Sequence, residues 1–95
     1  MSKVLVRGGN TPDNAEVLDD AEFIRLCYST IKDKTVELEN STESSQVLDA
    51  LSDILELSMS IIQKENITAQ NLFAHAMNRR NVEGSFLDKK AITKE

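Results

Sequence analysis

The sequence has little of what disulfide-linked, membrane-spanning or secreted proteins need. Its single cysteine, Cys27, cannot form an internal disulfide, which fits a reducing compartment. No apolar run approaches the length that crosses a bilayer, and none follows Lys3 and Arg7 as a signal peptide would. We therefore expect a soluble, cytoplasmic protein that does not bind a membrane.

Basic residues are also scarce. The chain has 11 Lys and Arg against 16 Asp and Glu, for a net charge of −5. A protein whose main partner is a nucleic-acid backbone needs a clustered basic surface, so this balance argues against nucleic acid. The single histidine and single cysteine offer no metal or nucleophile motif of their own, which leaves the acidic residues as the candidates for chemistry.

The length of 95 residues predicts one domain with a small core. Burial is limited at this size, so assembly with another subunit would help to complete the core. We expect a single domain over residues 1–95, with an arm and linker at 1–18, a helical body at 19–83 and a tail at 84–95. Residues 3–12 are β-prone but have no partner strand nearby, which favours an extended arm that packs on the body.

Apolar periodicity predicts three helices, at about 21–39, 44–64 and 69–80, and hence an all-α helical bundle. Residues with side chains suited to capping lie near the expected ends. These are Asp19 or Asp20 for the first helix, Asn40-Ser41-Thr42 for the second, Asn66 at its end, and Thr68 for the third.

The second helix is apolar on two sides, and this predicts a central position in a bundle or across a subunit interface. We therefore expect a homo-oligomer, either a dimer or a dimer of dimers. The two sides are Leu48, Leu51, Leu55 and Ile62, and Val47, Ile54, Leu57 and Ile61; on the third helix Leu72, Phe73, Ala76 and Met77 are expected to face inward.

Two acidic pairs with helical spacing are the strongest candidate for a binding site. Asp33 and Glu37 lie four residues apart on the first helix, and Asp49 and Asp53 do so on the second, so each pair shares one face. Carboxylates gathered from two helices suit Mg²⁺, which neutralises phosphate oxygens and positions an attacking water. A solvated acidic face is the alternative. Near the end of the third helix, Arg79 and Arg80 either bind phosphate or offset the helix dipole.

Several segments together resemble one family, the all-α nucleoside triphosphate pyrophosphohydrolases of the MazG-like and phosphoribosyl-ATP pyrophosphohydrolase-like branch. Members commonly show Leu-Val-Arg-Asp-Lys-Ile-Pro, Glu-Glu-x-x-Glu, Glu-Leu-Ala-Asp-Val-Leu-Glu and Lys-x-x-x-Arg-Gly-Gly-Phe, in this order. The matching segments here are Leu5-Val6-Arg7 with Pro12, Glu22-Phe23 and the acidic first helix, Leu51-Ser52-Asp53-Ile54-Leu55-Glu56, and Gly84-Ser85-Phe86. The resemblance covers nearly the whole chain and implies an all-α fold and a nucleotide ligand.

The resemblance also implies a metal site that has lost half of its ligands. In the family, four acids hold Mg²⁺ while water attacks the triphosphate and pyrophosphate leaves. Glu37 and Asp53 match two of these ligands, whereas Lys34 and Ala50 stand at the other two positions. Asp33 and Asp49 precede the lost ligands and remain candidates for a shifted metal site.

The phosphate-binding positions are altered as well. Arg79 matches the family's phosphate-contacting Lys, and Arg7 lies in the matching arm motif, but Glu83 replaces an Arg before the closing glycines. No catalytic residue is assigned. The sequence thus leaves three hypotheses: a nucleotide-binding protein with weak or no hydrolysis, an active Mg²⁺-dependent pyrophosphohydrolase, and a helical protein-interaction module.

Overall fold

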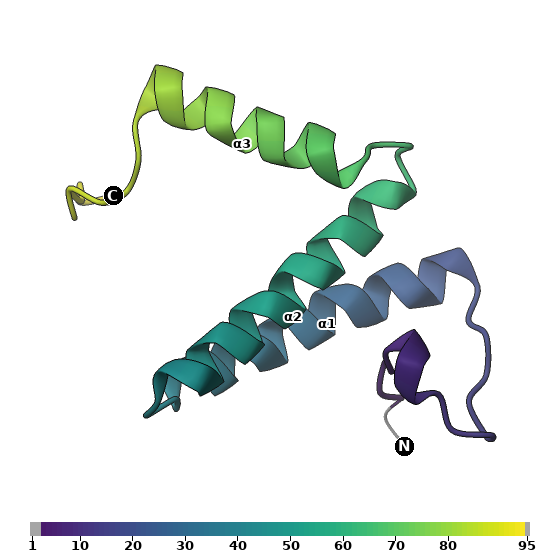
Figure 1. Ribbon diagram of the computed structural model, residues 1–95. Coiled ribbons are helices and arrows are strands. Elements are labelled where there is room, and N and C mark those ends of the chain that lie inside the picture. The colour runs from purple at the N-terminus through teal and green to yellow at the C-terminus, as the bar shows by residue number, and fades with distance from the viewer. Residues whose placement is uncertain (1–2, 95) are drawn as a thin grey trace.

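Helices make up most of the chain in the computed structural model, which describes residues 3–94 (Figure 1). A short 3₁₀-helix, η1 (Gly8–Asn10), precedes three α-helices, α1 (Asp20–Glu39), α2 (Ser44–Gln63) and α3 (Ala69–Glu83). No strand occurs within residues 3–94. The all-α prediction is therefore confirmed, and the β-prone segment near the N-terminus contains a 3₁₀ turn that the sequence analysis missed.

Side-chain caps fix where α1 and α2 begin. The Asp19 carboxylate accepts a hydrogen bond from the Glu22 backbone N–H at 2.8 Å, as one of the two predicted caps for α1. For α2 the prediction of a cap within 40–42 is wrong, because Glu43 occupies that position. Its capping box is completed by Gln46, whose amide oxygen accepts from the Glu43 backbone N–H at 3.1 Å.

The α3 helix begins as predicted and ends later than predicted. Thr68 caps it by accepting from the Asn71 backbone N–H at 3.1 Å. The helix continues to Glu83, three residues beyond the expected end, and stops at Gly84, whose φ of 88° a residue with a side chain rarely adopts. Asn66, predicted to end α2, has a left-handed φ of 59° in the turn between α2 and α3.

The core lies between α1 and α2, which run in opposite directions side by side (Figure 1). Cys27 on α1 is 0% exposed and Ala50 on α2 is 2% exposed. Among the residues whose burial the structure describes, these two alone are fully buried. Because alanine is small, Ala50 allows the two helix backbones to approach each other closely at this point.

The α3 helix diverges from this pair instead of lying along it (Figure 1). It contacts α2 and makes no contact with α1. Leu72 is partly buried, but Phe73 is 67% exposed and Ala76 and Met77 are also exposed, so most of the predicted inward face of α3 is wrong for a single chain. The physical reason is that α3 leaves the end of α2 at an angle, and its apolar side chains meet no other helix.

Within residues 3–94, no helix combines the length and the apolar character that crossing a membrane requires.

Substitution of Ala50 with leucine should destabilise the fold. The added methyl and methylene groups have no space between α1 and α2, so we expect a loss of about 1–3 kcal/mol in the free energy of unfolding, measured by urea denaturation. Ala21→Leu, at an exposed site in the first turn of α1, is the control and should change stability by less than about 0.5 kcal/mol. Equal stability of the two variants would show that Ala50 is not tightly packed between α1 and α2.

Candidate functional site

A cleft of about 610 Å³ opens where the N-terminal segment meets α1 and α2. This volume falls in the range that small-molecule sites occupy, and side chains of both charges and several apolar groups line it. The lining comprises Leu5, Val6, Arg7, Gly8 and Gly9 from the N-terminal segment, Phe23, Thr30 and Lys34 from α1, and Asp53, Glu56, Leu57 and Ser60 from α2.

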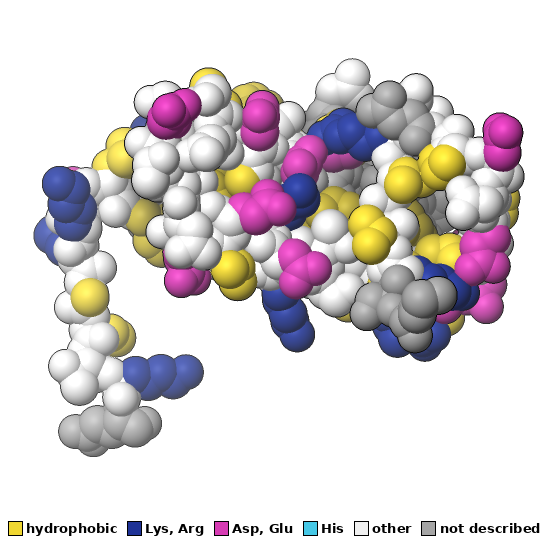
Figure 2. Space-filling view, turned by 90° about the horizontal axis from the view of Figure 1, so that it is seen from below, with side chains coloured by type: hydrophobic (Ala, Val, Ile, Leu, Met, Phe, Trp, Pro, Cys, Tyr) yellow, Lys and Arg dark blue, Asp and Glu magenta, His cyan; other side chains and the backbone are white. Residues whose placement is uncertain are grey.

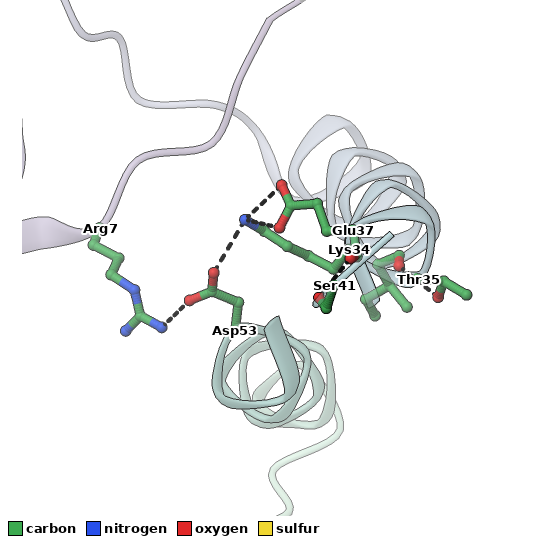
Figure 3. Close-up of polar contacts among 7 residues, drawn as sticks. Arg7, Lys34, Thr35, Glu37, Ser41 and Asp53 are labelled. Carbon is green, nitrogen blue, oxygen red and sulfur yellow. Dashed lines mark hydrogen bonds and ion pairs between the residues drawn. The ribbon is translucent and has the colours of Figure 1, made fainter. Parts of the chain in front are cut away.

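At one side of the cleft, a lysine ammonium lies between two carboxylates (Figure 3). Lys34 Nζ is 3.3 Å from Glu37 Oε2 on the same helix, as its i,i+3 spacing predicts. It is also 3.1 Å from Asp53 Oδ2 on α2. Glu37 and Asp53 are the two residues that match metal ligands in the family resemblance. The Lys34 ammonium therefore contacts both of the acids that would otherwise be available to a cation.

The second oxygen of Asp53 is occupied by Arg7 (Figure 3). The Arg7 guanidinium donates a short, charge-assisted hydrogen bond to Asp53 Oδ1. Lys3, also in the N-terminal segment, forms two further ion pairs. Its Nζ is 2.9 Å from Glu16 Oε1 and 3.0 Å from Glu22 Oε2. Asp53 thus joins three parts of the chain, namely the N-terminal segment, α1 and α2.

These contacts keep the groups charged. The Arg7 hydrogen bond, followed by that of Lys34, holds the pKa of Asp53 below its ordinary value. The Asp53 hydrogen bond raises the pKa of Lys34, although partial burial of the ammonium opposes this shift. Asp53 is only 27% exposed, so part of its hydration is replaced by these two cations.

The other acids of the predicted pairs lie outside this cluster. Asp33 and Asp49 are exposed on α1 and α2 and are not part of the cleft lining. Among the residues that the structure describes, no three His, Cys, Asp or Glu side chains come close enough together to hold a metal ion. The predicted set of four carboxylate ligands is thus not assembled in a single chain.

Ala50, which the family resemblance aligns with a metal ligand, is a core residue. Ala50 is 2% exposed and packs against α1, three residues before Asp53. A carboxylate at this position would enter the apolar contact between α1 and α2, where unpaired charge is costly. The two positions that the resemblance aligns with missing ligands therefore differ, because Lys34 brings a cation and Ala50 is packed in the core.

The predicted phosphate-binding residues are separated from each other. Arg7 lines the cleft, whereas Arg79 lies on α3, outside it. Arg79 Nε is 2.7 Å from Glu83 Oε2, one helical turn further along. This hydrogen bond lowers the pKa of Glu83 and offsets the positive charge that Arg79 could present to a phosphate.

Two ion pairs that were not predicted from the sequence differ in whether a local pattern indicates them. The pairing of Arg79 with Glu83 has a local signal, because an i,i+4 spacing of opposite charges predicts contact on a helix. The pairing of Arg7 with Asp53 spans 46 residues and depends on how the N-terminal segment folds back, for which no local pattern exists. Arg7 was predicted only as a phosphate ligand.

No protein family, curated protein or solved structure that was compared matches this chain.

The Asp53 ion pairs should make stability depend on pH in the acidic range. Because the folded-state pKa of Asp53 is lowered, its stabilising contribution is complete above the ordinary value of about 3.9 and is lost as pH falls through the folded-state value. We expect the free energy of unfolding, measured with urea between pH 7 and pH 3, to fall less steeply in Asp53→Asn than in the unmodified chain. Asp49→Asn, at an exposed site four residues away, is the control and should retain the slope. Identical slopes in all three proteins would contradict the assignment.

Proposed function

We propose that this chain binds a nucleotide in the cleft between its N-terminal segment, α1 and α2, and hydrolyses it weakly or not at all. The proposal combines the family resemblance, which implies a nucleotide ligand, with the chemistry of the cleft. The observation that carries it is the position of the Lys34 ammonium, 3.1 Å from Asp53 and 3.3 Å from Glu37.

The Lys34 ammonium opposes metal binding both by its charge and by the space that it occupies. A dication that approached Glu37 and Asp53 would have to displace an ammonium held by both, and would be repelled by its charge if the ammonium stayed. Arg7 on the other oxygen of Asp53 adds a second cation. The residues present therefore do not fit a Mg²⁺ site, and the proposal includes no hydrolysis by a metal-activated water.

The same cations suit an anionic ligand. Arg7 and Lys34 bring two positive charges to the cleft, and a guanidinium matches phosphate oxygens in a two-pronged geometry. Phe23 and Leu57 add apolar surface, on which the planar base of a nucleotide can pack. Gly8 and Gly9 have open space where a Cβ would lie, so the backbone here does not crowd a ligand. A phosphate would compete with Asp53 and Glu37 for the two cations.

This competition can be tested by removing the negative charge of Asp53. If phosphate competes with Asp53 for Arg7 and Lys34, Asp53→Asn should raise the affinity for nucleoside triphosphates by about two- to fivefold, since partly exposed ion pairs are worth up to about 1 kcal/mol. Binding is measured by calorimetry over a panel of nucleotides in EDTA, with Asp49→Asn as the control. We also expect little or no pyrophosphate release in Mg²⁺.

Release of pyrophosphate would instead identify an active hydrolase. Mg²⁺-dependent pyrophosphate release that disappears in Asp53→Asn would contradict the proposal and favour a metal-dependent pyrophosphohydrolase. A chain that binds no nucleotide of the panel, with or without Mg²⁺, would contradict both and leave the interaction-module hypothesis.

Replacement of the internal cation should create metal affinity. Lys34→Glu would place three carboxylates together, with Glu37 and Asp53, and remove the ammonium, so we expect Mg²⁺ or Mn²⁺ to bind at least tenfold more tightly than in the unmodified chain. Lys32→Glu makes the same change of charge at an exposed site on α1 and is the matched control. Titration calorimetry distinguishes them. An equal gain in both variants would indicate only a more acidic surface, and no gain would mean that Lys34 does not block a metal site.

A further inference from the structure

A single chain leaves far more surface exposed than a folded monomer of its mass. Its accessible surface is 8495 Å², against about 5,500 Å² expected for a monomer of 10.6 kDa. Its radius of gyration is 16.1 Å, against about 12 Å for a compact domain of 95 residues. The excess of about 3,000 Å² indicates that the fold is completed by something that covers this surface.

Part of the uncovered surface is an apolar stripe on α2, formed by Leu48, Leu51 and Leu55. Their exposed fractions are 67%, 48% and 56%, and their spacing of three and four residues places them on one side of the helix. This side is opposite to the one on which Ala50 packs against α1. The two-sided apolar pattern of α2 is therefore only half used within one chain.

A second part lies on α3 and the tail that follows it. Large apolar side chains are exposed along both, and α3 contacts α2 but not α1 (Figure 1). The exposed side chains are Phe73, Met77, Val82, Phe86, Leu87 and Ile92. An exposed series of this kind is unusual for a monomer and is typical of an interaction surface.

The two surfaces differ in charge. The segment that comprises α1 and α2, residues 20–63, contains nine Asp and Glu against three Lys and Arg. From Ala69 to the end of the chain there are five Lys and Arg against three Asp and Glu. Figure 2 shows acidic and basic side chains together on the body, and basic side chains on the C-terminal tail that hangs away from it. The two segments that carry the uncovered apolar surfaces thus have net charges of opposite sign.

We propose that the occupant of this surface is a second copy of the chain, with α3 and the tail of each copy lying over the Leu48–Leu51–Leu55 stripe of the other. A twofold axis makes this exchange reciprocal, so that both uncovered surfaces are buried by one assembly. The excess of about 3,000 Å² per chain, or about 6,000 Å² for a pair, is enough for even a large obligate interface. A chain with so small a core needs its partner in order to fold, and another copy is present in equal amount. The inference does not depend on what the cleft binds.

The oligomeric state in solution and its concentration dependence test this proposal. Sedimentation equilibrium should give a dimer or a multiple of it, and the midpoint of thermal unfolding should rise with protein concentration, because association and folding are linked. A wild-type chain that is monomeric at all concentrations, with a constant unfolding midpoint, would overturn the proposal. If the chain were monomeric and sedimented with phosphatidylglycerol vesicles, a membrane would cover the apolar surface instead. This result would also overturn the proposal of a second copy.

Variants with matched controls locate the surface. Leu51→Gln combined with Leu55→Gln should raise the dimer dissociation constant at least tenfold, because the stripe loses apolar contact area. Val36→Gln on α1 is the control, since Val36 is 55% exposed and Leu55 is 56% exposed. A dimer as tight as the unmodified one in the double variant would contradict the assigned surface, as would equal weakening by Val36→Gln.

A charge variant keeps the proposal testable if the double variant fails to fold. Arg80→Glu lies at an exposed site near the end of α3, and should weaken the dimer several-fold, more at low salt than at high salt. Arg25→Glu makes the same change of charge at an exposed site on α1, and should leave the dissociation constant unchanged or raise it less than Arg80→Glu does. Equal effects of the two variants would overturn the pairing of α3 and the tail with α2.

Discussion

The arrangement of the cleft depends on one carboxylate with two cationic partners. Asp53 accepts from Arg7 through one oxygen and from Lys34 through the other, and so connects the N-terminal segment to α2 and α2 to α1. Without these contacts the N-terminal wall of the cleft would be held chiefly by Lys3 and its two glutamates. Because Asp53 is shared, any ligand of the cleft has to compete for Arg7 or Lys34, and any metal has to compete for Asp53 itself.

Because Asp53 is shared by two cations, the residues that resemble a metal site favour different chemistry here. A divalent cation gathers several carboxylates and in return polarises water and phosphate. An ammonium satisfies two carboxylates with one charge and three N–H donors, and it activates no water. Lys34 therefore preserves the attraction between α1 and α2 near Asp53. Ala50, packed in the helix contact, leaves no room nearby for a replacement ligand.

The sequence predicted those features that depend on neighbouring residues. Helix periodicity placed α1 and α2 within about one residue of their ends. It did not predict that α3 diverges, because periodicity indicates which side of a helix is apolar and not what that side meets. The contacts of Asp53 with Arg7 and Lys34 were missed for a related reason, since they depend on how separate segments come together.

The Lys34 ammonium lies between Glu37 and Asp53, in the place that a metal bound by these two acids would need. The most direct measurement is NMR of the carboxyl carbons of these two residues and of the Lys34 ammonium during a titration with Mg²⁺. The account predicts hydrogen-bonded, slowly exchanging protons on the Lys34 nitrogen, and carboxyl shifts that change only weakly and without saturation. Saturable shifts at both Glu37 and Asp53, with release of the Lys34 ammonium to solvent, would contradict it.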